Sequence, residues 1–191
     1  MYGDQRPSAL TRKMGQLRNS WNTMLVAIIS DSHDNLATLA KFLDFAQKNR
    51  IGAVIHCGDV AQSETMAYMA KRFDGRIYVC EGNMDYDHEL EYAAAKFPDR
   101  ISYFKDFGTA MIDGVNIGFC HRKETAISKC ETRTFDFVFY GHTHKPWLEK
   151  INGCLLANPG NLSGTFYKAT FAVLDTATKK LDLKIVENLK S

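Results

Sequence analysis

Seven polar side chains directly follow strand-like apolar runs, and all are of types that bind divalent metal ions. They comprise two carboxylates, one carboxamide and four imidazoles: Asp31, His33, Asp59, Asn83, His121, His142 and His144. Any one of them alone would be an ordinary loop residue. Together they exceed the four ligands of a tetrahedral zinc, whereas two ions sharing one carboxylate would use them all. The sequence therefore predicts a dinuclear metal centre.

Such a centre suits the hydrolysis of a phosphate ester. Water is a poor nucleophile at neutral pH, and the phosphodiester anion repels hydroxide. Two ions roughly 3.5–4 Å apart can bring the pKa of bound water toward ~7 and clamp the attacking and transferred oxygens. With two carboxylates and a bridging hydroxide, two divalent ions keep a net positive charge that attracts phosphate. Asn83 would give a neutral oxygen to a metal and leave its amide N–H for a phosphoryl oxygen.

These ligands require a sheet that gathers strand ends at one rim. The apolar run over 25–29 predicts a strand buried on both faces, and it ends at Asp31 and His33. Further elements are predicted as a helix over 35–49, a strand over 53–57, a helix over 63–73 capped by Ser63, a strand over 76–80 and a helix over 87–97. This alternation predicts a parallel sheet with right-handed crossovers, whose ligands collect at the carboxyl ends of the strands.

After Pro98 the pattern changes to hairpins. Asp113-Gly114 and Asn152-Gly153 each lie between apolar runs and are strong two-residue turn signals. Strands are expected over 115–120, ending at His121, and over 135–140, ending at Gly141-His142-Thr143-His144, with a last hairpin of 170–174 and 181–186. The predicted fold class is therefore α/β, with two mixed sheets packed face to face and helices outside.

The ordered motifs resemble the calcineurin-like metallophosphoesterase superfamily. Asp-x-His, Gly-Asp, Gly-Asn-x-Asp, a strand-end His and Gly-His-x-His follow one another from Met24 onward, and Asn158-Pro159-Gly160-Asn161 is similar to a loop of the small single-domain bacterial and archaeal phosphodiesterases. A eukaryotic cousin of that branch is the retromer subunit. The resemblance implies a four-layer αββα sandwich as a single domain over 24–191. It assigns Asp31, His33, Asp59 and His144 to one ion, and Asp59, Asn83, His121 and His142 to the other, with Asp59 bridging.

The expected function is a metal-dependent phosphodiesterase that works by direct attack of a hydroxide bound to the dinuclear centre, with no further catalytic side chain. The alternatives are a phosphomonoesterase or a nuclease on the same site, and a non-catalytic scaffold like the retromer subunit. Two divalent ions are the expected cofactors, with manganese first and iron, zinc or nickel as alternatives. The expected partner is a small phosphorylated substrate. The oligomeric state stays open.

Two positions depart from the pattern of the superfamily. Met84 stands where some members carry a histidine as general acid, and Arg122 follows the strand-end histidine where glycine is common. An arginine there could bind phosphate with two parallel hydrogen bonds or simply be a loop charge. His56 is interpreted as a packed strand histidine. The pocket wall comes from loops, with aromatic candidates at Tyr86, Phe104 and Phe166.

Composition sets limits on the class of protein. The 191 residues suffice for one domain, and no apolar run approaches the ~18 residues that span a bilayer. Five scattered cysteines (Cys57, Cys80, Cys120, Cys130 and Cys154) favour a reducing compartment, hence the cytoplasm, over a disulfide framework. Residues 1–23 carry a charge of +3 and the rest −1, so nothing suggests the basic field that drives nucleic-acid binding.

Residues 1–23 differ from the rest of the chain. Leu10, Met14, Leu17 and Trp21 fall at helical spacing among basic residues. The segment is interpreted as an N-terminal extension: a start placed too early, a docking helix or tail, or an organellar transit peptide. All seven candidate ligands lie beyond it.

Overall fold

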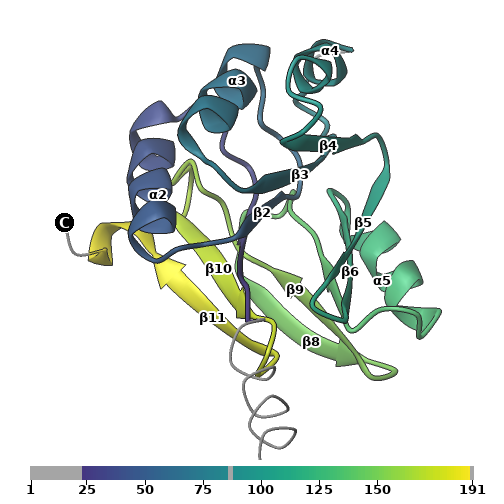
Figure 1. The fold of residues 1–191 in the computed structure, drawn as a ribbon. Coiled ribbons are helices and arrows are strands. Elements are labelled where there is room, and N and C mark those ends of the chain that lie inside the picture. Colours follow the sequence, from purple (N-terminus) through teal and green to yellow (C-terminus); the bar gives the residue numbers. More distant parts are fainter. Residues whose placement is uncertain (1–22, 86–87, 190–191) are drawn as a thin grey trace, which may run out of the picture.

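The protein is described by a computed structural model that covers residues 23–85 and 88–189. Two β-sheets pack face to face, with three helices beside one sheet and a fourth beside the other (Figure 1). The predicted four-layer sandwich is thus confirmed. The predictions for residues 1–22, for Tyr86 and for the start of the helix at 87 fall outside the described residues.

The first sheet is built around the opening strand of the domain. Its strand order is β11-β10-β1-β2-β3-β4, in which β1 to β4 run parallel and β10 and β11 antiparallel to their neighbours. The strands are β1 (Leu25–Ile29), β2 (Ala53–His56), β3 (Arg76–Cys80), β4 (Ile101–Phe104), β10 (Thr170–Asp175) and β11 (Lys180–Ile185). The central place of β1 explains its continuous apolar sequence, because a strand covered on both faces offers no position to water.

Alternate residues of β1 belong to two separate cores. Ala27 and Ile29 pack toward the helices, whereas Val26 and Ile28 pack toward the second sheet, and all four are fully buried. The helical layer consists of α2 (Leu36–Lys48), α3 (Ser63–Arg72) and α4 (Glu89–Ala95), and a short 3₁₀ helix, η1 (Val186–Asn188), follows β11. Because both faces of β1 are buried, the strand ends where its apolar run ends, and this places Asp31 and His33 just beyond that end.

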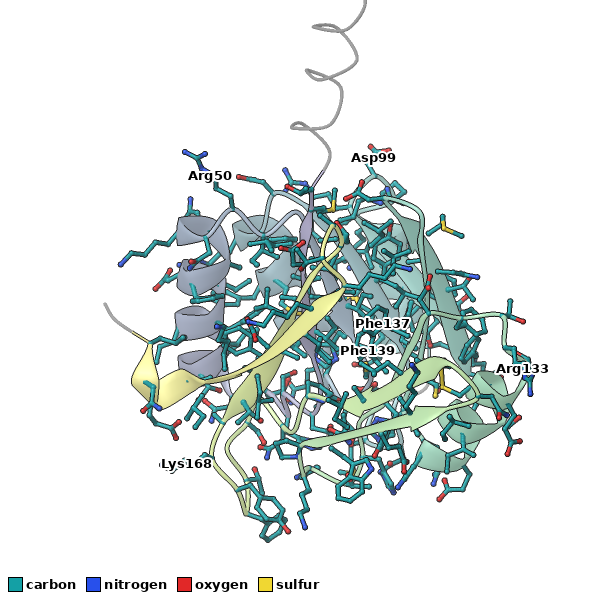
Figure 2. All side chains as sticks on the ribbon, turned by 90° about the horizontal axis from the view of Figure 1, so that it is seen from below. Arg50, Asp99, Arg133, Phe137, Phe139 and Lys168 are labelled. Atoms are coloured by element: carbon teal, nitrogen blue, oxygen red, sulfur yellow. A yellow bond between two sulfur atoms is a disulfide. The ribbon has the colours of Figure 1, made fainter. Side chains whose placement is uncertain are left out.

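The second sheet has the order β5-β6-β7-β9-β8 and is mixed. Its strands are β5 (Phe107–Ile112), β6 (Val115–Cys120), β7 (Phe137–Phe139), β8 (Trp147–Ile151) and β9 (Cys154–Asn158), and α5 (Lys123–Glu131) packs against β6, β7 and β9. Phe137 and Phe139 of the central β7, labelled in Figure 2, stack with ring centroids 5.8 Å apart. The side-chain view shows these two rings inside the molecule.

Three local predictions were wrong. Helix α3 has Gln62, not Ser63, at its N-cap; the Ser63 hydroxyl bonds Glu64, while Asp34 Oδ1 accepts hydrogen bonds from the Gln62 N–H and the Thr65 hydroxyl. The segment after Pro98 does not begin with a hairpin, because β4 still extends the parallel sheet beside β3. Phe104 does not line a pocket; its ring packs edge-on against Phe119 in the core, with centroids 5.3 Å apart.

The cysteine prediction was wrong for one pair. Cys130 at the end of α5 and Cys154 at the start of β9 form a disulfide, with their Cα atoms 5.4 Å apart. Cys57, Cys80 and Cys120 are free and buried. Spacing alone could not reveal the pair, because its two residues meet only through the packing of α5 on the sheet. The cysteines therefore no longer argue for a reducing compartment, and the cytoplasmic location stays a prediction. Among the described residues, no helix has the length and apolar character needed to cross a membrane.

Candidate metal centre

The ends of five strands (β1, β2, β3, β6 and β7) meet at one rim. Backbone hydrogen bonds tie the loops that follow them: the Asp31 N–H donates to the Gly58 carbonyl at 3.0 Å, and the Gly141 N–H donates to the His121 carbonyl at 3.1 Å. The His142 N–H in turn donates to the Asp31 carboxylate at 3.1 Å. The rim is therefore one connected unit, and it carries all seven predicted ligands.

Three of these side chains form what we call the first cluster: Asp31, His33 and His144. The Nε2 atoms of the two histidines lie 3.3 Å apart, and that of His144 lies 3.2 Å from Asp31 Oδ1. Asp59 Oδ2 lies 3.7 Å from His33 Nε2, on the side facing the rest of the site. Asp31 is fully buried, whereas the side chains of His33 and His144 are 24% and 17% exposed. The cluster is thus closed to solvent at Asp31, which forms its base, and partly exposed at the two histidines, which form its open top.

Asn83, His121 and His142 form the second cluster. His121 Nε2 is its centre, at 3.0 Å from Asn83 Oδ1 and 3.2 Å from His142 Nδ1. The same nitrogen lies 3.4 Å from Asp59 Oδ2. One oxygen of Asp59 therefore faces both clusters, as expected of a bridging carboxylate. The assignment of the seven residues as metal ligands stays a prediction.

The backbone at the rim is held in a conformation that side chains disfavour. Five of the seven residues (Asp31, His33, Asp59, His142 and His144) have positive φ angles, between 41° and 66°. Non-glycine residues rarely adopt this left-handed region, and such strain concentrates at functional sites. All five lie in the loops that follow β1, β2 and β7.

The glycines near the ligands serve close approach. A Cβ on Gly82 would clash with the carboxylate and backbone N–H of Asp59, and one on Gly141 would clash with the Ser30 hydroxyl. Gly82 and Gly141 therefore let neighbouring strand ends touch, and Gly58 has a φ of +97°.

Asp85 is a supporting residue that the sequence analysis did not recognise. Its carboxylate accepts hydrogen bonds from the backbone N–H groups of Asp59, Ala61 and Gly82. Burial raises the pKa of Asp85, and these N–H donors partly offset that effect. Asp85 therefore fastens the β2 and β3 loops together. Its place in the Gly-Asn-x-Asp motif was the available signal.

The loop after β9 supports the other side of the site. Asn158 Nδ2 donates to the Gly141 carbonyl at 2.8 Å, and Asn161 Nδ2 donates to the His144 carbonyl at 3.2 Å. The Asn158-Pro159-Gly160-Asn161 motif is therefore explained by contacts that orient the Gly-His-x-His loop.

The charges of the site are strongly coupled. Burial alone would raise the pKa of Asp59, but hydrogen bonding to His121 and its charge outweigh burial and lower it. Burial correspondingly lowers the pKa of His121, and the Asp59 carboxylate more than reverses this effect. The hydrogen bond with Asp31 raises the pKa of His144. His121 and His144 are thus drawn toward the cationic form by the carboxylates beside them, which indicates that these carboxylates attract positive charge.

This donor set fits divalent cations. The pairs of histidine nitrogens at 3.2–3.3 Å point at each other and at carboxylates, an arrangement that a shared cation satisfies. His121 Nδ1 faces the Cys57 carbonyl at 2.9 Å, and this hydrogen bond leaves the Nε2 lone pair directed into the cluster. Carboxylate, carboxamide and imidazole suit several first-row metals.

A small pocket opens beside the second cluster. Its volume is about 200 Å³, and its lining includes Asn83, His121, Arg122 and Lys105. Arg122, at the N-cap of α5, is exposed. Met84 is also exposed, at 54%, and its backbone N–H donates to Asp59 Oδ1 at 2.8 Å. An anion in this pocket would therefore have a guanidinium beside the predicted ligands.

His56 lies beneath the first cluster, fully buried in β2. Its Nε2 hydrogen-bonds the hydroxyl of Ser32, the residue between Asp31 and His33, at 2.9 Å. Burial lowers the pKa of His56 to about 4. His56 is therefore a packed strand histidine, as predicted, and it also braces the first loop of the site.

The fold and this rim together define a metallophosphoesterase. The model of the calcineurin-like phosphoesterase superfamily domain matches residues 24–179, and the chain belongs to that superfamily. It is 27% identical over 163 residues to a phosphodiesterase from Methanocaldococcus jannaschii, an alignment that covers 82% of this chain and 96% of that protein.

Solved structures agree with this assignment. The structure of a novel archaeal phosphodiesterase is similar with a TM-score of 0.78 and 25% identity, covering 85% of this chain and 99% of that one. Vacuolar protein sorting 29 from Cryptosporidium parvum has a TM-score of 0.61 and 19% identity, covering 86% of this chain and 97% of that one. The second likeness shows the shared fold alone. The prediction of a phosphoesterase of this superfamily is confirmed.

Proposed function

We propose that this chain is a metal-dependent phosphodiesterase acting on a small phosphorylated substrate. The observation that carries the proposal is the pair of clusters that share the Asp59 carboxylate, with His33 Nε2 and His121 Nε2 at 3.7 and 3.4 Å from one oxygen. The likeness to the M. jannaschii phosphodiesterase supports it. Two ions bound here, with manganese as our first choice, would polarise a phosphoryl group and lower the pKa of a water molecule.

The residues of the chain then have separate tasks. Asp31, His33 and His144 would hold one ion, and Asn83, His121 and His142 the other, with Asp59 between them. Asn83 is exposed at the mouth, so its amide N–H can also donate to a phosphoryl oxygen.

Arg122 would fix the phosphate from the side. Its guanidinium can form two parallel hydrogen bonds to phosphate, and Lys105 adds a second positive charge to the same pocket. Glu81 and Asp106 also line this pocket, so the guanidinium itself, and not the net charge of the pocket, would select the phosphate. A phosphoryl group held by Arg122 would lie toward the predicted ligands of the second cluster.

The test is an assay of purified protein with manganese, iron, zinc and nickel supplied in turn. We expect bis-p-nitrophenyl phosphate to be hydrolysed faster than p-nitrophenyl phosphate, with turnover lost on chelation. Faster monoester hydrolysis would make the protein a phosphomonoesterase, and turnover of single-stranded DNA a nuclease. No turnover with any metal would favour a scaffold.

A pair of variants connects that activity to Arg122. Arg122→Gln should raise KM for the diester, because it removes the charge that binds phosphate while keeping a hydrogen-bonding side chain. Arg133→Gln, at the exposed position labelled in Figure 2, is the matched control for loss of a surface charge. Equal effects of the two changes would contradict a specific role for Arg122.

A further inference from the structure

One aromatic side chain stands in solvent beside the first cluster. Phe166 is 90% exposed, more than any other large apolar side chain in the described ranges. Its ring centroid lies 6.3 Å from that of His144, and the two planes are tilted by 39°. The loop that carries it, residues 159–169, is exposed over 164–168, and Figure 2 labels Lys168 of this part at the periphery of the molecule. The ring therefore borders the open top of the site.

The segment before this ring is firmly attached to the site. Asn161 donates to the His144 carbonyl, and its Oδ1 accepts from the Thr165 N–H and the Ser163 hydroxyl, each at 2.9 Å. The Ser163 N–H donates to the Asp31 carbonyl at 3.0 Å. These bonds join the loop to two predicted metal ligands, so the backbone up to Thr165, the residue before Phe166, is held against the site.

The backbone conformation of Phe166 makes its exposure more informative. Its φ angle is +64°, which is unfavourable for a bulky side chain. A strained residue that buries its ring would recover the cost through packing, but Phe166 buries almost none of its surface. Backbone strain is concentrated at functional sites, and the ring of this strained residue lies next to His144 of the candidate site.

We propose that Phe166 is a specificity-determining residue that stacks on a planar aromatic ring of the substrate, an aryl group or a nucleobase. The inference rests on the proposed function and deepens it by naming the substrate class. The phosphate would lie over the predicted ligands with Arg122 on the far side, while the aromatic group extends across His144. The two sides of the site differ as this proposal requires. The side at Phe166 offers an apolar ring, whereas the pocket at Arg122 and Lys105 is polar and charged.

Binding measurements test this without relying on turnover. Calorimetry on the full chain loaded with manganese would compare methyl phosphate, phenyl phosphate and adenosine 5′-monophosphate. A stacked ring is worth at least about fivefold in affinity, so both aromatic ligands should bind more tightly than methyl phosphate by that factor. Phe166→Ala should abolish the gap and leave methyl phosphate within about twofold, and Phe166→Tyr should preserve it.

Two further variants sharpen the test. Phe166→Leu keeps an apolar side chain but removes the flat face, so the gap should shrink almost as far as in Phe166→Ala. Tyr92→Ala removes an aromatic ring that is 68% exposed on α4 and should change nothing. If Phe166→Ala weakens the binding of adenosine 5′-monophosphate more than that of phenyl phosphate, the substrates are nucleoside esters. If it weakens the binding of phenyl phosphate more, they are simple aryl esters.

The outcomes separate this inference from the proposed function. If methyl phosphate binds the parent protein and aromatic ligands bind no better, Phe166 has no such role and the metal centre stands. If phenyl phosphate binds through Phe166 while methyl phosphate does not bind, the ring has the proposed role and the phosphate site fails. If no ligand binds, both ideas are overturned.

Discussion

The two clusters of the site use similar side chains but are supported differently. In the second cluster, His121 is 4% exposed and its Nδ1 is fixed by the Cys57 carbonyl. In the first cluster, the buried Nδ1 of His144 makes no hydrogen bond within the described part of the chain, although the Thr165 backbone lies close enough to raise its pKa. One ring nitrogen is thus fixed by a well-formed hydrogen bond in His121, and only by a weaker interaction with the Thr165 backbone in His144.

This difference suggests a division of labour. A ligand whose orientation is fixed before binding loses less conformational freedom when the ion arrives, so the second cluster is the better preorganised one. The first cluster is more open, and it borders the exposed Phe166. We therefore expect the second cluster to bind its ion more tightly, and the first to adapt to what enters the site.

The largest effect should come from the residue that both clusters share. Asp59→Asn keeps the volume but removes the negative charge opposite His33 and His121, so we expect metal content to fall below one ion per chain and turnover to vanish. Elemental analysis, circular dichroism and the diester assay would show this. Asp74→Asn, an exposed carboxylate, is the control. A variant that keeps two ions and normal rates would refute the bridging role.

Chelation tests both clusters without a mutation. Ions at about a thousand times their dissociation constant would stabilise the native state by roughly 4 kcal/mol, so EDTA should lower Tm and abolish turnover together. Thermal denaturation with and without EDTA measures this effect. Asp59→Asn should melt at the same temperature in both conditions. An unchanged Tm in the parent protein would argue against metal binding at the rim.

The stability of the fold should fall in acid because of His56, which lies beneath the first cluster. Its folded-state pKa of about 4 lies below the ordinary 6.5, so the unfolded chain takes up a proton in this range while the native state does not. Stability is therefore fully present above pH 6.5 and is lost as the pH falls toward 4, by about 3 kcal/mol. Denaturant unfolding in EDTA, at a pH above 6.5 and at a pH near 4, measures this loss of stability.

A pair of variants isolates this contribution from the other titrating groups. His56→Gln has no such proton to take up and should lose less stability between the two pH values than the parent protein. His88→Gln, at an exposed histidine, should behave as the parent does. Equal losses in the parent protein and His56→Gln would show that other groups cause the acid sensitivity.

The predicted difference in metal affinity between the two clusters can be measured directly. Calorimetric titration of the parent protein with manganese should show two steps. His144→Ala should retain the tighter step, whereas His121→Ala should lose it, with an effect of at least about tenfold in Kd. The reverse pattern would mean that the solvent-facing cluster binds first and that fixing the His121 tautomer does not govern affinity.

Much of the fold and of the candidate site could be predicted from the sequence, because strands end where apolar runs stop. The run before Asp31 predicted β1, and the glycine-containing motifs predicted the rim. The positive φ angles of Asp31 and His142 were not predictable, because propensity disfavours them and only the packed loops enforce them.

What the sequence could not supply were contacts between distant segments. Cys130 and Cys154 are brought together by the packing of a helix on a sheet, and β4 pairs with β3 although Pro98 marks a change of pattern. The same holds for Phe166, which the sequence offered as a candidate for the pocket wall but could not place. Only the structure sets it beside His144.

The smallest expected effect concerns Met84, at the mouth of the second cluster. A departing alkoxide must be stabilised, and a positioned acid typically contributes ~10²–10⁴-fold. Met84 has no proton to give, and Asp85 is engaged by three backbone N–H groups. Rates should therefore fall steeply as the leaving-group pKa rises.

Met84→His should flatten this dependence, because the added imidazole helps poor leaving groups most and activated aryl esters least. A series of diesters with graded leaving groups, assayed on both proteins, gives the two slopes. Met84→Gln, which is similar in length but cannot act as an acid, is the control and should keep the steep slope. A shallow slope already in the parent protein would mean that another residue donates the proton, and Lys123, at the start of α5 beside Arg122, would be examined first.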